Sequence, residues 1–223
     1  MPSLPVRDEL GPTLPDLAAP YWRRLPRAAR LALVALAVLV VAAILWRAVG
    51  PAADAGETSV VVSDPVAFNL RFGGDLERVA ATGGASLALE AREDGDVVQS
   101  FVVEPLELPP YRGLAAGTLP VYAESVKDRL ASRFDDFTMV HEGRTRINEV
   151  PGYELVFAAR NEAGRRVYGR WVMLVPDEPG AREGVTLQLF ARWGARVPNA
   201  DALGDQGQLK LPLRSFRFGT EAP

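Results

Sequence analysis

Cysteine is absent from this 223-residue chain, and histidine occurs once. The lack of cysteine excludes a disulfide scaffold, thiol catalysis, thiolate metal sites and lipid attachment through a cysteine. A single histidine excludes a metal site built from several imidazoles. The net charge of −3 gives no general reason to expect nucleic acid as a partner. The composition, 48% apolar and 24% charged, excludes a collagen-like chain and a wholly disordered one.

One long apolar run stands out near the N-terminus. Leu31–Trp46 contains sixteen residues without a charge, and the surrounding window 28–49 contains 22 residues. A helix of that window is about 33 Å long, which matches a hydrocarbon core about 30 Å thick. The window therefore predicts one transmembrane helix that contacts the lipid bilayer. A buried core helix is the alternative, but core helices are rarely apolar on every face.

The charges around this run predict its orientation. Four arginines precede it within eight residues: Arg23, Arg24, Arg27 and Arg30. Arg47 alone follows it closely, so the positive-inside rule places the N-terminus in the cytoplasm and the rest of the chain outside. A cleaved signal peptide is the alternative, with 53–55 as the cleavage site. The long region before the apolar run and the position of Arg47 argue against cleavage.

The rest of the chain divides into three parts. Residues 1–27 contain six prolines and no apolar periodicity, which is typical of a disordered cytoplasmic tail. Residues 50–57 form a short linker rich in Ala and Gly. Residues 58–219 are long enough for one domain that buries a sizeable core without disulfides. An extracytoplasmic domain without cysteine suggests a bacterial cell envelope.

Alternating polar and apolar residues predict an antiparallel sheet in this domain. The Asp94-Gly95 pair is typical of a hairpin turn, and Val97–Glu104 follows it as a strand. Further alternation covers the segments 86–92, 153–157, 167–175 and 185–193. Strands joined by short turns indicate a meander with one covered face.

Two helices are expected beside this sheet. Thr118 can cap the first and Pro120 suits its first turn. Apolar residues then recur every four positions, at Tyr122, Val126, Leu130 and Phe134. This pattern predicts an amphipathic helix of about four turns. A second, weaker helix is expected over Asn199–Gln208. The fold class is therefore α+β, an antiparallel sheet flanked by helices as an α/β/α sandwich.

Four segments carry a resemblance to a known family. They are an aromatic strand at Phe68–Phe72, a long helix at Leu119–Phe137, a small-residue turn and strand at Val150–Phe157, and a closing segment at Ser215–Arg217. In this order they resemble the PsbP-like superfamily, which includes Mog-type Ran-binding proteins and the DcrB and LpqN-like lipoproteins. The resemblance implies an antiparallel sheet flanked by helices and a non-enzymatic binding or assembly module. It implies no catalytic residue.

Arginines concentrate between positions 144 and 196. We expect Arg166, Arg170 and Arg192 to gather on one sheet face, where they would bind an anion or a partner. Acidic residues are interleaved with them, so a mixed, solvated surface is the alternative. Trp171 and Trp193 fall on the apolar side of their strands, which favours core packing over a pocket.

Other reactive side chains give weaker signals. His141 with Glu142 is the first place to look for acid–base chemistry, although a surface histidine is the simpler interpretation. The carboxylates at 94 and 96 and at 135 and 136 lack the dense spacing of a metal site. Glu104 and Glu107 flank Pro105 and are a candidate carboxylate pair, but nothing in the sequence indicates that they share a face. No catalytic, cofactor-binding or metal-ligating residue is therefore assigned.

These observations predict a membrane-anchored extracytoplasmic module that binds an envelope protein and works without catalysis, cofactor or nucleic acid. A small-ligand carrier or sensor, with a cavity between the helix 119–134 and the sheet, is the alternative. A third hypothesis is an envelope hydrolase built around His141.

Overall fold

The computed structural model describes residues 26, 56–178, 180–194 and 196–221. The expected transmembrane helix at 28–49, the tail and most of the linker lie outside these residues. Within the described part of the chain, no helix is both long and apolar enough to cross a membrane. The described residues from Gly56 onward belong to one compact unit, Asp54–Pro223.

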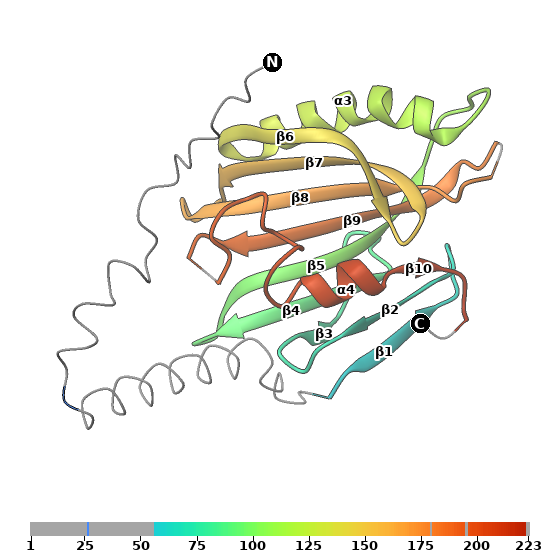
Figure 1. Ribbon diagram of the computed structural model, residues 1–223. Helices are drawn as coiled ribbons and strands as arrows, with labels where there is room; N and C mark the ends of the chain where they lie inside the picture. The colour runs from blue at the N-terminus through green and yellow to red at the C-terminus, as the bar shows by residue number, and fades with distance from the viewer. Residues whose placement is uncertain (1–25, 27–55, 179, 195, 222–223) are drawn as a thin grey trace, which may run out of the picture. The chain divides into compact units, whose positions relative to one another are not determined.

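A seven-stranded antiparallel sheet forms the centre of this unit (Figure 1). Its strands run in the order β3-β4-β5-β9-β8-β7-β6, which leaves β3 and β6 at the edges. The strands are β3 (Glu77–Val79), β4 (Leu87–Glu93), β5 (Asp96–Glu107), β6 (Asp135–Ile147), β7 (Val150–Arg160), β8 (Arg166–Leu174) and β9 (Glu183–Arg192). The alternation in the sequence predicted most of them, because each strand presents its apolar residues to one packed layer.

A second sheet, of three strands, joins the two ends of the domain. Its order is β1-β2-β10, with β1 at Thr58–Val62, β2 at Phe68–Phe72 and β10 at Arg217–Phe218. The sequence predicted one sheet, so this second sheet is a correction. The aromatic strand Phe68–Phe72 lies in its middle, and the ring of Phe68 stacks on Phe216 with centroids 5.6 Å apart. The closing segment thus completes the core instead of lying on its surface.

Two helices are described, α3 (Ala115–Arg133) and α4 (Lys210–Ser215). The long helix was predicted, but it begins before Thr118. Leu114 is its N-cap and gives no side-chain cap, so Thr118 does not cap it. Buried Ala115 packs in the same cluster as Leu119, which explains the extra turn.

The expected helix at Asn199–Gln208 is wrong. Positive φ angles at Gly204 and Gly207 give turns there, and the short α4 follows them instead. Glycine suits such angles because it lacks a Cβ atom. The chain therefore reaches α4 only after residues 199–208, which we call the turn segment and which lie against the sheet at Leu203.

Different layers cover the two faces of the large sheet. One face packs against α3 through Leu155, Phe157 and Met173. The other packs against the small sheet and α4 through Leu187, Leu189 and Leu213, among others. The antiparallel α+β class is confirmed, but the α/β/α arrangement is wrong, because a six-residue helix is too short to cover a face by itself. The small sheet and the turn segment complete that layer.

Gly169 on β8 offers a test of packing under α3. A Cβ atom there would lie 2.2 Å from the ring of Phe157, its partner on β7. We expect Gly169→Ala to lower the free energy of unfolding by about 1–3 kcal/mol, because overpacking forces the ring to move. Gly117→Ala is the control, since a Cβ on that helical residue meets nothing within 4 Å and should stabilise by about 0.5–1 kcal/mol. Chemical denaturation measures both, and equal effects would contradict the packing described.

Candidate functional site

A groove runs along one side of α3. The helix packs on β6 and β7, and the strands β9 and β5 continue the same sheet face beyond it. A hollow of about 390 Å³ lies between the helix and these strands, and we call it the α3 groove. Its helix wall includes Tyr122, Val126 and Leu130. This volume falls in the range of small-ligand sites.

The floor of the α3 groove carries two mostly buried polar side chains whose polar atoms remain accessible from the hollow. Thr186 is 8% exposed and Gln188 is 6% exposed, and both lie on β9. Gln188 faces the indole of Trp171 across the strand pair. Neither Thr186 nor Gln188 hydrogen-bonds through its side chain to another described residue. Because their polar atoms are not fully enclosed by protein, both side chains can hydrogen-bond to a molecule in the groove.

The walls of the α3 groove carry charges of opposite sign. Arg129 and Arg133 lie one turn apart on α3, and Glu104 lies on β5, directly opposite Thr186. Within the described part of the chain, none of these three charged groups forms an ion pair. Arg133 instead lies over the ring of Phe134, 5.5 Å from its centroid.

A second hollow, of about 270 Å³, lies next to this groove at the C-terminal end of α3. Arg133 lines both, and Phe190 and Arg192 continue the line of Thr186 and Gln188 along β9. Its surface is mainly apolar, with Phe134 among its residues. The open half of this sheet face therefore offers a polar hollow and an apolar one side by side.

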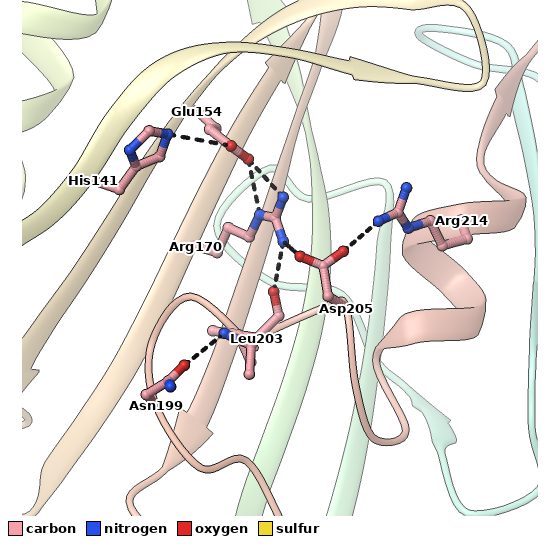
Figure 2. Close-up of polar contacts among 8 residues, drawn as sticks. His141, Glu154, Arg170, Asn199, Leu203, Asp205 and Arg214 are labelled. Carbon is pink, nitrogen blue, oxygen red and sulfur yellow. Dashed lines mark hydrogen bonds and ion pairs between the residues drawn. The ribbon is translucent and has the colours of Figure 1, made fainter. Parts of the chain in front are cut away.

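The opposite sheet face holds a buried ionic network (Figure 2). Arg170 is 7% exposed and donates through Nε to Glu154 at 2.9 Å, with Nη2 of Arg170 at 2.7 Å from the same oxygen. Its Nη1 donates to the carbonyl of Leu203 at 2.8 Å and to Asp205 at 3.1 Å. Arg214 donates to the other oxygen of Asp205. Arg170 therefore fastens the turn segment before α4 to the sheet.

The charges of this network satisfy one another. Burial raises the pKa of Asp205, but the hydrogen bond from Arg214 and the charge of Arg170 outweigh burial, so this pKa lies below 3.8. His141 on β6 reaches the edge of the network, with Nε2 3.8 Å from Oε1 of Glu154. The arrangement stabilises the turn segment. Every guanidinium nitrogen of Arg170 already contacts Glu154, Leu203 or Asp205.

The three arginines predicted to share a face do not do so. Arg166 and Arg170 point to the same side of β8, but Arg192 pairs with Val167, whose side chain points to the α3 side. Arg170 is buried in the network, Arg192 pairs with Asp96, and Arg166 lies over Trp193. Alternation within one strand could not reveal the register between β8 and β9. The predicted common anion face is therefore wrong.

The other predicted residues are also placed. Glu104 and Glu107 are an odd number of positions apart on β5 and face opposite sides, and Glu107 pairs with Arg182. Asp96 follows the hairpin turn and pairs with Arg165, whose hydrogen bond and charge lower the pKa of Asp96 below 3.8.

Asp136 follows the start of β6 and pairs with Arg160. Trp171 packs in the core as expected. Trp193 is 58% exposed, because β9 ends at Arg192 and its alternation stops there. Its assignment to the core is therefore wrong.

The residues of the α3 groove were missed as a site. Alternation over 185–193 places Thr186 and Gln188 on the polar side of their strand, and the helical period places Arg129 on the polar side of the helix. Polar sides normally face solvent, so nothing in the local pattern indicated that these residues meet. Predicting this groove requires knowing how far α3 extends across the sheet, and no single segment of the sequence shows that.

Comparison with known proteins places the fold. No family model and no curated protein matches the sequence. The structure is similar to LpqN of Mycobacterium tuberculosis, with 13% identity, a TM-score of 0.51, and coverage of 74% of this chain and 93% of LpqN. Cyanobacterial PsbP (CyanoP) of Synechocystis matches with 13% identity, a TM-score of 0.47, and coverage of 76% and 96%. The yeast Ran-binding protein Mog1p matches with 9% identity, a TM-score of 0.45, and coverage of 73% and 95%. The resemblance expected from the sequence is thus confirmed as a likeness of fold.

The ionic network predicts a large difference between two arginines on β8. Arg170→Met leaves the carboxylate of Glu154 buried without its guanidinium, so we expect the free energy of unfolding to fall by about 3–5 kcal/mol. Arg166→Met, at an exposed position, should change it by about 0.5 kcal/mol or less. Urea denaturation compares the two. Adding Glu154→Leu to Arg170→Met should recover much of the loss, and equal losses for the two arginines would contradict the network's structural role.

Proposed function

We propose that this chain is a single-pass membrane protein whose extracytoplasmic domain binds a ligand in the α3 groove without catalysing a reaction. The apolar window 28–49, with its arginines on the N-terminal side, supports an anchor with the domain outside the membrane. The domain would then work close to the bilayer surface, as a carrier, a sensor or an assembly module.

The observation that carries this proposal is the hollow of the α3 groove, with the polar side chains of Thr186 and Gln188 on its floor. Thr186 and Gln188 each offer both a donor and an acceptor, and neither has a protein partner among the described residues. Because these polar atoms are accessible from the hollow and have no protein partner, a ligand in the groove can hydrogen-bond to both, which favours a binding role for the groove.

The likeness to LpqN supports a setting in the cell envelope. LpqN is described as involved in cell envelope biogenesis, and its fold is the one found here. The lack of cysteine and the expected position outside the membrane are consistent with a bacterial envelope. We therefore propose that the ligand is met in that compartment.

A second candidate function is assembly with a protein through β6. This strand is an edge of the large sheet, and its outer side pairs with no other strand in the described part of the chain. Irregular pairing between Asp135 and His141 discourages strand addition there, but the seven residues His141–Ile147 are regular. An extended segment of an envelope protein could add beside them.

Native mass spectrometry of full-length protein purified from its own membranes tests the ligand-binding proposal. We expect wild type to carry a small-molecule adduct, and Gln188→Leu to lower its occupancy about tenfold or more, because the amide is lost while the side-chain size is kept. Gln206→Leu is the control, since Gln206 is exposed and lies outside the groove-lining residues.

The thermal midpoint of each variant checks that folding is intact. Equal adduct on Gln188→Leu and on wild type would contradict the role of the groove. A wild-type protein without any small-molecule adduct would favour assembly through β6 instead.

A further inference from the structure

We infer that the α3 groove binds a small zwitterion, with its ammonium group beside Glu104 and its carboxylate or phosphate beside Arg129 and Arg133. This inference rests on the proposed function of the groove as a ligand site. It adds the chemical class of the ligand and the direction in which the ligand lies.

Unpaired charges at the two walls carry the inference. Glu104 on β5 and the arginines of α3 line one hollow, yet no guanidinium nitrogen lies within the 4.0 Å of an ion pair with that carboxylate. Glu104 is half-buried, and Arg129 and Arg133 are exposed. Here a gap separates them, and a molecule with a charge at each end would bridge it.

Nearby charges behave differently. Lys127 on the same helix pairs with Glu124 and Glu142. Arg182, directly before β9, pairs with Glu107 at the end of β5. In the groove, by contrast, charges of both signs line one hollow, and none of these three groups forms an ion pair with a described residue.

The floor fits the middle of such a ligand. The hydroxyl of Thr186 and the amide of Gln188 lie on β9, the strand that follows β5 in the sheet, with Glu104 directly opposite Thr186. Each can donate to a carbonyl or phosphate oxygen and accept from an N–H or O–H group. Val126 and Leu130 add an apolar side that suits a few methylene or methyl groups.

The charges also exclude simpler ligands. A simple anion would leave Glu104 without a partner, and a simple cation would leave Arg129 and Arg133 without one. A neutral molecule would leave all three charges without partners. A zwitterion satisfies both walls, and such ligands occur in an envelope as short peptides and as phosphoethanolamine headgroups of lipids.

A matched series of ligands tests the charges directly. Alanyl-alanine carries both charges, N-acetyl-alanyl-alanine only the negative one, and alanyl-alanine amide only the positive one. Glycerophosphoethanolamine represents the lipid headgroup. Dissociation constants come from saturation-transfer NMR on the full-length protein in uncharged detergent micelles. We expect at least one zwitterion to bind about tenfold or more tightly than either singly charged peptide, and the tighter zwitterion identifies the source.

Two substitutions test which end of the ligand lies beside which charge of the groove. Glu104→Gln should weaken zwitterion binding about tenfold and leave the N-acetyl peptide unaffected or tighter. Arg129→Gln should weaken the zwitterion and the N-acetyl peptide alike, and it preserves the helix because the two residues have similar propensities. Glu107→Gln and Arg78→Gln are the controls, since both residues are exposed and lie outside the groove-lining residues. Neither should change the constants by more than about twofold.

The results separate this inference from the function on which it rests. Equal binding of the three peptides, failure of every probe to bind, or binding unaffected by Glu104→Gln and Arg129→Gln would each overturn the zwitterion. A native adduct that depends on Gln188 would keep the groove as a ligand site in any of these cases. Loss of that dependence would overturn the proposed function itself.

Discussion

One long helix cannot cover a seven-stranded sheet, and the rest of the site depends on this mismatch. Neighbouring strands lie about 4.8 Å apart, so seven strands span roughly 29 Å, whereas a helix with its side chains is about 10 Å across. The helix α3 packs on β6 and β7, at one edge of the sheet. The face beyond it, over β9 and β5, is left to form the α3 groove and the apolar hollow beside it.

Several elements together cover the opposite face of the large sheet. There the three-stranded sheet, the turn segment and α4 together cover the strands, and Arg170 links the turn segment to the sheet. Its charge meets Glu154 and Asp205, while the arginines of the groove meet no carboxylate. The contrast between a satisfied network and an unsatisfied groove is the physical reason for placing function on the α3 side. The buried charges of the network are paired and hold the turn segment to the sheet, whereas the exposed arginines of the groove are accessible to a charged ligand.

Local patterns predicted the elements better than their arrangement. The period of two along β4, β7, β8 and β9 and the period near four along α3 follow from burial of one side of each element, and both are visible in the sequence. The small sheet escaped prediction because β2 and β10 lie far apart in the chain. The turn segment was mistaken for a helix, because its glycines adopt angles that the apolar pattern does not reveal.

The candidate site was also hard to predict, because it depends on how the elements are arranged. Arg170 was predicted to lie on an anion or partner face, but the turn segment that folds over it buries it in the ionic network. Arg192 was grouped with it, although the register of β8 and β9 points Arg192 to the other face. Thr186 and Gln188 looked like residues of a solvated strand side, and only the position of α3 makes them the floor of a groove.

The central claim is that the α3 groove holds a small molecule in the living cell, and photocrosslinking at two neighbouring positions tests it directly. Benzoylphenylalanine in place of Tyr122 would face the groove, whereas in place of Val121, which is 74% exposed, it would lie outside the groove-lining residues of the same helix. After irradiation of intact cells, mass spectrometry of the purified protein should find a small-molecule adduct at position 122 and none at 121. The same adduct at both positions, or none at 122, would contradict the account.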